Sequence, residues 1–183
     1  MKPSLILPLP ILETERLLLR KLDRSDKDAL YSMLSDAENI QFIDRNPVKN
    51  DAEVIDFIDI RNIGVDQNEC YYWGIVLKEN NELVGTICLW NFSENLEKAE
   101  LGYELNKAHQ RKGYMGEAVK VVIAFAFNNL KIKNLEAYTH IDNAGSISLL
   151  RKNSFRLEEI FKDQYLKKSG EYDMMVFVLE NDE

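Results

Sequence analysis

The sequence contains few of the residues that mark disulfide or metal chemistry. Its 183 residues include only two cysteines, Cys70 and Cys88, which do not form a C-x-x-C pair. Unpaired cysteines of this kind are typical of a reducing compartment. The two histidines, His109 and His140, lie far apart and lack the spacing of metal ligands. We therefore expect neither a disulfide nor a bound metal.

Positive charge is also scarce. The chain has 23 Lys and Arg against 31 Asp and Glu, a net charge of −8. Proteins that bind nucleic acids usually need a basic face, so this composition argues against a nucleic-acid partner. An acidic enzyme tends to attract cationic substrates, although net charge alone is weak evidence.

Long apolar runs are absent as well. No run approaches the roughly twenty residues that a membrane-spanning helix needs. The apolar segment 5–12 contains two prolines, has only Lys2 ahead of it and lacks a small-residue cleavage site after it. It therefore reads as the approach to a first strand rather than as a signal peptide. We expect a cytoplasmic protein without a membrane partner.

The hydrophobic patterns predict a single α/β domain over residues 1–183. Strands are expected at 12–22, 71–78, 83–92, 99–105, 135–140, 155–161 and 173–179. Helices are expected after an N-cap at Ser25 with Asp28 as its capping-box partner, from Asn50 or Asp51, at 117–130 and at 146–152. This order combines hairpins with a strand–helix–strand unit, which implies one parallel strand pair at the centre of the sheet.

The stretch 99–118 carries the clearest chemical signal. A strand ends, a short basic loop follows, and an apolar helix begins. The first turn of a helix has unpaired N–H groups and partial positive charge, which suits a pyrophosphate. Gly113 and Gly116 leave room for its approach, and Arg111 and Lys112 add positive charge. The loop matches neither the dinucleotide fingerprint nor the P-loop, and by itself it leaves a plain helix start equally open.

Several short motifs in a fixed order settle that alternative. They are Glu13-Thr14-Glu15-Arg16-Leu17, Glu100-Leu-Gly-Tyr, Gln110-x-x-Gly113-x-Met115, Asn143-x-x-Ser146 with Lys152-x-Ser154-Phe155, and Ser169-Gly170-x-Tyr172-Asp173. Together they resemble the GNAT superfamily of N-acetyltransferases, and its RimJ/RimL-like branch, over nearly the whole chain. The sequence departs from the family at Met115, where many members have Gly or Ala, and at Ser154, where Gly is usual. Leu150 stands where many members carry the tyrosine proposed as general acid.

The resemblance implies a fold, a reaction and a binding site. The fold is a mixed, mostly antiparallel sheet whose central parallel pair splays around the acyl-CoA site, flanked by helices. The reaction is direct attack of an amine on the thioester of acetyl-CoA, with no metal. The acceptor is a protein N-terminus, a polyamine or another small amine, and a homodimer is left open. Cofactor contacts are implied for Tyr103, Glu104, Leu105, Arg111, Lys112, Gly113, Tyr114, Met115, Gly116, Asn143 and Ser146.

The catalytic groups are inferred from the chemistry of the reaction. An amine is mostly protonated at neutral pH, so a base must take its proton. Strand alternation puts Glu100 and Glu104 on one face, and we prefer Glu100 as the base. Both carboxylates could instead be surface groups. Ser146 either donates a proton to the leaving thiolate or caps the helix that begins there.

Two other functions remain open. The absent tyrosine at position 150 is compatible with a non-catalytic acyl-CoA-binding sensor or scaffold, which would bind acetyl-CoA without turnover. A nucleotide-binding module would bind ATP or NAD in a manner that coenzyme A does not displace. The acceptor pocket would be built mainly by residues 25–62 and by the loop before the last strand, neither of which has a readable code.

Overall fold

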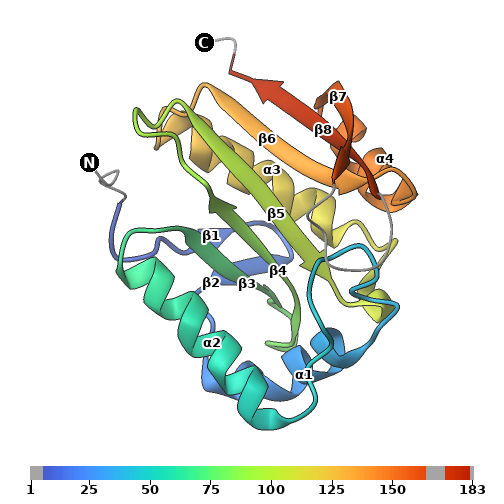
Figure 1. Ribbon diagram of the computed structural model, residues 1–183. Helices are drawn as coiled ribbons and strands as arrows, with labels where there is room; N and C mark the ends of the chain where they lie inside the picture. Colours follow the sequence, from blue (N-terminus) through green and yellow to red (C-terminus); the bar gives the residue numbers. More distant parts are fainter. Residues whose placement is uncertain (1–5, 164–171, 182–183) are drawn as a thin grey trace.

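Figure 1 shows the computed structural model of the chain, which describes residues 6–163 and 172–181. Eight strands form one sheet in the order β1-β2-β3-β4-β5-β6-β8-β7. The strands are β1 (Leu12–Glu13), β2 (Leu17–Arg20), β3 (Tyr71–Leu77), β4 (Leu83–Trp90), β5 (Lys98–Leu105), β6 (Asn134–His140), β7 (Arg156–Asp163) and β8 (Tyr172–Glu180). The helices are α1 (Lys27–Ser35), α2 (Asp51–Asp66), α3 (Tyr114–Asn128) and α4 (Ala144–Lys152), with 3-10 turns at Arg24–Asp26 and Lys107–His109.

Among the strands that the structure describes, β5 and β6 are the only parallel neighbours, and their pairing is short. Their pairing runs from Lys98 opposite Asn134 to Glu100 opposite Glu136 and then stops. Beyond that point β5 stays with β4 and β6 stays with β8, so the sheet opens into a slit (Figure 1). The expectation of a mixed sheet with a splayed parallel pair is confirmed.

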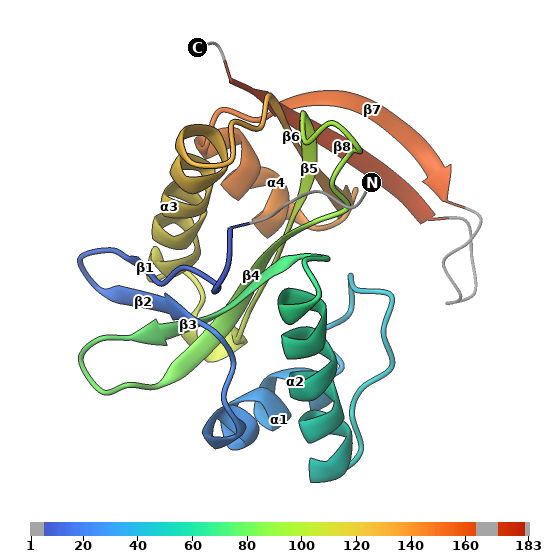
Figure 2. The same ribbon diagram turned by 90° about the vertical axis from the view of Figure 1, so that its left-hand side faces the viewer.

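Two helices cover each face of the sheet, and the hydrophobic core is larger on one face than on the other. In Figure 2, α3 and α4 lie on one face, and α1 and α2 lie on the other. The core under α3 includes the buried rings of Trp73, Phe125 and Phe177. A smaller core joins α1 and α2 to β3 and β4. Helices α3 and α4 therefore border the slit on one face of the sheet, and α1 and α2 lie on the opposite face beside β3 and β4.

The predicted first strand, 12–22, is wrong as a single element. Residues 12–20 form a hairpin of β1 and β2, in which the Thr14 amide donates to the Leu17 carbonyl. The predicted cap at Ser25 is also wrong, because the Asp23 carboxylate accepts from the Ser25 amide and the Asp26 carboxylate accepts from the Asp23 amide. Asp26 is buried and paired with Arg20, an ion pair between strand and helix that local pattern does not reveal.

Other helix starts differ from the sequence prediction by a few residues. The α2 start is confirmed, since the Asn50 side chain accepts from the Glu53 amide. Helix α3 begins at Tyr114 rather than at 117, and α4 begins at Ala144 rather than at 146. Residues 169–171 of the late motif, like the loop expected to help build the acceptor pocket, lie outside the described residues. In the described ranges, no helix is long and apolar enough to cross a membrane.

Candidate active site

The start of α3 presents free backbone donors. Gly113 precedes the helix in the left-handed conformation, with φ of 85°, and contributes no side-chain cap. The first intrahelical bond runs from the Glu117 amide to the Gly113 carbonyl, at 3.1 Å. The amides of Tyr114, Met115 and Gly116 therefore have no hydrogen-bond partner within the described ranges. Three N–H groups at the positive end of the helix dipole form a site that suits a pyrophosphate.

Arg16 reaches this helix start from the first hairpin. Its guanidinium binds the Glu117 carboxylate at 2.7 Å, donates to the Lys112 carbonyl at 3.1 Å, and lies 4.7 Å from the Tyr114 ring centroid. Glu117 also accepts from the Thr14 hydroxyl. Partial burial raises the pKa of Glu117, but hydrogen bonds from Thr14 and Arg16 bring it below its ordinary value. The Glu117 carboxylate thus links the β1–β2 hairpin to α3. Arg16 adds a cation beside the start of α3, which the sequence analysis did not identify.

A cavity of about 890 Å³ extends from this helix start along the end of β5 to the start of α4. All of the cofactor-binding residues expected from the sequence line it except Lys112, whose carbonyl is held by Arg16. One further wall comes from the segment between α1 and α2, with Glu38, Asn39, Gln41, Phe42 and Ile43. Glu100 does not line this cavity, whereas Glu104 and Ser146 do.

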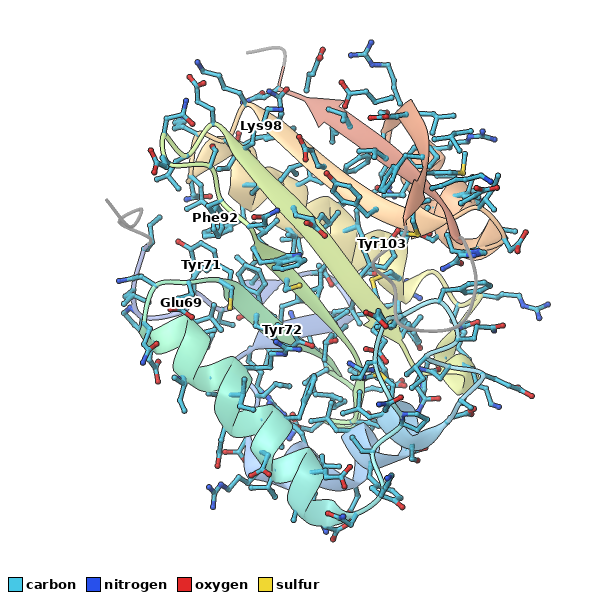
Figure 3. All side chains as sticks on the ribbon, in the orientation of Figure 1. Glu69, Tyr71, Tyr72, Phe92, Lys98 and Tyr103 are labelled. Atoms are coloured by element: carbon cyan, nitrogen blue, oxygen red, sulfur yellow. The ribbon has the colours of Figure 1, made fainter. Side chains whose placement is uncertain are left out.

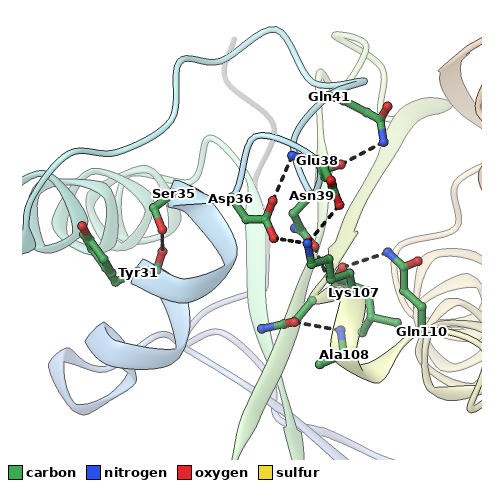
Figure 4. Close-up of polar contacts among 11 residues, drawn as sticks. Tyr31, Ser35, Asp36, Glu38, Asn39, Gln41, Lys107, Ala108 and Gln110 are labelled. Atoms are coloured by element: carbon green, nitrogen blue, oxygen red, sulfur yellow. Dashed lines mark hydrogen bonds and ion pairs between the residues drawn. The ribbon is translucent and has the colours of Figure 1, made fainter.

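The segment between α1 and α2 is tied to the turn that follows β5. The Lys107 ammonium pairs with Asp36 at 2.7 Å and with Glu38 at 3.0 Å, as Figure 4 shows. The Lys107 amide donates to the Asn39 side chain at 2.9 Å. In the same turn, Gln110 donates to the Leu105 carbonyl at 3.4 Å. These contacts hold one wall of the cavity against the strand that forms its floor.

Two hydroxyl groups meet on the α4 side of the slit. The Tyr103 hydroxyl lies 2.7 Å from the Ser146 hydroxyl, and Figure 3 shows Tyr103 far along β5 from Lys98. Burial raises the pKa of Tyr103 to about 12, so this phenol keeps its proton at neutral pH. The alternative that Ser146 caps α4 is wrong, because Asn143 accepts from the Ser146 amide at 3.1 Å. The Ser146 side chain is therefore left for the cavity.

Glu100 lies on the opposite face of β5, at the last rung before the slit opens. It is half-buried, and burial is the main reason that its pKa is raised to about 7. The charge of Glu136 raises the pKa further, while the Asn91 amide, 3.4 Å away, opposes the rise. A carboxyl group with this pKa exchanges its proton near neutral pH, which is what a general base needs.

Glu104 has a different environment on the same strand face. Its side chain is 7% exposed, and one Arg45 nitrogen donates to its two oxygens at 2.8 and 3.0 Å. Burial raises the pKa of Glu104 above its ordinary value, and the Arg45 charge offsets only part of that rise. The carboxylate joins β5 to the segment between α1 and α2 through its pair with Arg45. Leu150, at the position of the family tyrosine, is fully buried in the core.

Solved structures share this fold. An acetyltransferase (GNAT family) from Bacillus anthracis superposes with a TM-score of 0.84 at 24% identity and covers 95% of this chain and 100% of its own. RimL, a ribosomal L7/L12 alpha-N-protein acetyltransferase in complex with coenzyme A, gives a TM-score of 0.83 at 21% identity, covering 94% of this chain and 99% of its own. At these identities the likeness establishes the fold alone.

Sequence relatives extend the likeness to the family. The uncharacterized N-acetyltransferase p20 of Bacillus licheniformis is 32% identical over 168 residues, 92% of this chain and 94% of its own length. The uncharacterized N-acetyltransferase YoaA of Bacillus subtilis (strain 168) is 30% identical over 169 residues, 92% and 95% of the two lengths. A family profile described as the acetyltransferase (GNAT) domain matches residues 16–156. The chain belongs to the GNAT family of acetyltransferases.

Proposed function

We propose that this acetyltransferase transfers the acetyl group of acetyl-CoA to the primary amine of a protein N-terminus, a polyamine or another small amine. The observation that carries the proposal is the slit between β5 and β6, which has a carboxyl group with a pKa near 7 on one face and a hydroxyl pair on the other. RimL acts on a protein N-terminus, which supports that acceptor class and the RimJ/RimL-like branch. Cytoplasmic location and a single domain over 1–183 stay predictions, and a homodimer stays open.

The cofactor contacts follow from the free backbone groups. The amides of residues 114–116 and the Arg16 cation would hold the pyrophosphate. From Leu101 to Leu105, no described strand lies beside the β5 edge that faces the slit. Its backbone groups would bind the amide-like pantetheine arm. The distance from Leu105 back to Glu100 is about 17 Å for five residues of strand, enough for an extended arm to lie along it.

The two faces of the slit would then perform the proton transfers. Glu100 takes a proton from the ammonium group of the acceptor, directly or through a water, so that the nitrogen lone pair attacks the thioester carbon. A C–N bond forms as the C–S bond breaks, and the second proton of the nitrogen, like the one held by Glu100, passes to solvent. The leaving sulfur takes its proton from Ser146, which regains one from the Tyr103 hydroxyl, and water returns a proton to Tyr103. The hydroxyl pair would thus do the work of the tyrosine that is absent at position 150.

Acetyl-CoA is expected to raise the melting temperature of the protein. A ligand that binds only the folded state stabilises it by mass action, by about 2.7 kcal/mol at a concentration of 100 Kd. Free coenzyme A should act similarly, since the pyrophosphate contacts do not involve the acetyl group. Differential scanning fluorimetry checks this, and the absence of a shift at millimolar concentrations of either compound would sink the proposal.

Ser146→Ala is expected to lower kcat by about 10²-fold, the lower end of general acid catalysis. Tyr103→Phe should cost about tenfold, because it removes one hydrogen bond worth roughly 1–1.5 kcal/mol. KM for acetyl-CoA should change little in both. Ser148→Ala is the matched control, since Ser148 also lies on α4 and lines the cavity. Wild-type kcat in both Ser146→Ala and Tyr103→Phe would remove the hydroxyl pair from the mechanism.

A further inference from the structure

A half-buried arginine on α2 lacks an ionic partner. The Arg61 guanidinium carbon lies 4.9 Å from the Phe57 ring centroid and 5.4 Å from that of Tyr72. Its Nε is buried without a hydrogen-bond partner, and no carboxylate of the described residues pairs with Arg61. Several other arginines of the chain pair with acids, as in Arg20 with Asp26 and Arg156 with Glu180.

The charge around Arg61 is unbalanced. Arg45 also lies over Phe57, with its guanidinium carbon 5.5 Å from the ring centroid, and its Nε is likewise buried and unpartnered. Arg45 is paired with Glu104, and Arg61 makes no ion pair with that carboxylate, although its charge lowers the pKa of Glu104. The remaining positive charge stands in a chain whose net charge is −8. A cation removed from water is costly unless an anion pairs with it, so this arrangement is suited to receive one.

The Arg61 guanidinium lies close to two aromatic rings and makes no ion pair with a described carboxylate. An arginine that packs its flat faces on aromatic rings keeps the N–H groups at its edge, which can bind a carboxylate through two parallel hydrogen bonds. Phe57 and Tyr72 supply two such rings at 79° to each other, so the guanidinium can lie flat on only one of them. Figure 3 shows Tyr72 between α2 and the sheet. Lysine could not use this site in the same way, because its ammonium is a point charge without a planar fork.

Arg61 stands over the face of the sheet from which Glu100 projects. Tyr72 pairs with Cys88 on β4, and Cys88 pairs with Gly102 on β5. Strands lie about 4.8 Å apart, so Gly102 is about 10 Å across the sheet from Tyr72. Burial raises the pKa of Cys88 to about 12, and the Arg61 charge opposes that rise, so its field extends over β4.

We propose that Arg61 binds a carboxylate of the acceptor, so that the substrate is a small amino carboxylic acid whose amine lies at Glu100. The inference rests on the proposed acetyl transfer and specifies its acceptor. Glu100 lies two residues from Gly102 along β5, so the amine and the carboxylate must be several bonds apart. An amine without an anionic group would leave Arg61 unpaired and would bind less tightly.

The test compares acids with their amides. The probes are ω-amino carboxylates of two to eight carbons and the corresponding primary amides, which share the amine and differ in one negative charge. For the wild-type protein, kcat/KM should favour the acid by about 10- to 100-fold at the best chain length, the effect of a charge-assisted hydrogen bond. Arg61→Gln should abolish that preference while leaving the amide rates unchanged. Arg61→Lys should keep only part of it.

A control variant for Arg61→Gln makes the same change of charge at another arginine. Arg156→Gln removes an exposed arginine on β7 that pairs with Glu180, and it should keep the full preference for acids. The melting temperature of each variant and its response to acetyl-CoA verify folding and cofactor binding. Equal kcat/KM for acid and amide in the wild type, or an equal loss of both in Arg61→Gln, would overturn the anion site. Acetylation of the amides alone would also overturn it and would leave the proposed function standing.

If no probe is acetylated, the melting temperature of the coenzyme A complex is measured with each acid and each amide. A larger shift by the acid that disappears in Arg61→Gln supports the site without relying on turnover. No shift by any acid overturns it. The acetyl-CoA shift described above then tells whether acyl-CoA binding has failed as well.

Discussion

Glu100→Gln should lower kcat by about 10²–10⁴-fold at neutral pH, the usual contribution of a general base. The amide cannot accept the ammonium proton, whereas cofactor affinity should barely change because Glu100 lies outside the cavity. In the wild type, the rate should rise with pH through about 7 as Glu100 loses its proton. The variant should lack that inflection, and its deficit should shrink as the acceptor amine becomes neutral. Steady-state kinetics from pH 5.5 to 9.5 measure both effects.

Stability provides an independent readout of the same substitution. A carboxyl group with a pKa raised by burial binds a proton more readily in the folded state than in the unfolded one. Its contribution to stability is therefore greatest below its unfolded pKa and is lost as pH rises through about 7. Glu100→Gln removes that loss, so the variant should gain melting temperature relative to the wild type between pH 5 and pH 8. A slow variant that is also more stable cannot be explained by misfolding.

Glu104→Gln is the matched control on the same strand face, and it should give the opposite pattern. Breaking the Arg45 pair leaves a half-buried cation, which costs about 3–5 kcal/mol. This would lower the melting temperature by roughly 2–4 °C per kcal/mol, while kcat should fall clearly less than in Glu100→Gln. If Glu104→Gln were the slow variant and Glu100→Gln had a normal rate, the roles of the two carboxylates would be reversed.

The sequence predicted those parts of the site whose signal is local. The glycine-bearing loop 110–116 was found because its residues are adjacent and its role depends on backbone amides. The start of α3 was still predicted three residues too late, at Glu117 instead of Tyr114. The apolar pattern begins only after the glycine-bearing first turn, and a turn that lacks a side-chain cap gives no start signal.

The missed features join residues that lie far apart in the chain. Arg16 and Glu117 are 101 residues apart, Arg45 and Glu104 are 59 apart, and Tyr103 and Ser146 are 43 apart. No periodicity encodes such pairs, since each depends on which strands and helices become neighbours. The pKa of Glu100 has the same origin, because it comes from burial beside Glu136 of the parallel strand. Sequence alone preferred Glu100 over Glu104 as the base, but it could not show the different surroundings of the two carboxylates.

Gly113→Val should abolish acetyl-CoA binding, with at least a 100-fold loss of affinity. Gly113 has φ of 85°, a conformation that costs about 1–2 kcal/mol for any residue with a Cβ and more for a branched one. The added Cβ would lie 3.3 Å from Arg16 Nη2, so it would also displace the cation beside the phosphate site. Each of the three amide donors and this cation contributes about 1.5–3 kcal/mol to the binding of a charged ligand. Losing several of these contacts would therefore weaken binding by more than the roughly 2.7 kcal/mol that a 100-fold loss of affinity requires. Isothermal titration calorimetry measures the affinity.

The control for Gly113→Val should place a branched residue in the same left-handed backbone region, but outside the loop 110–116. Ser154 has φ of 67° and lies just after α4, so Ser154→Val introduces a branched residue in the same left-handed region. Because Ser154 already carries a Cβ, Ser154→Val adds only the strain of branching and should lose less melting temperature than Gly113→Val, and only Gly113→Val should lose acetyl-CoA binding. A Gly113→Val protein that folds and binds acetyl-CoA with unchanged affinity would show that the start of α3 does not hold the phosphates. The pantetheine arm of acetyl-CoA would then have no phosphate contacts to position it in the slit. Without that position, the assignment of Glu100 and Ser146 to opposite sides of the thioester would lose its geometric basis.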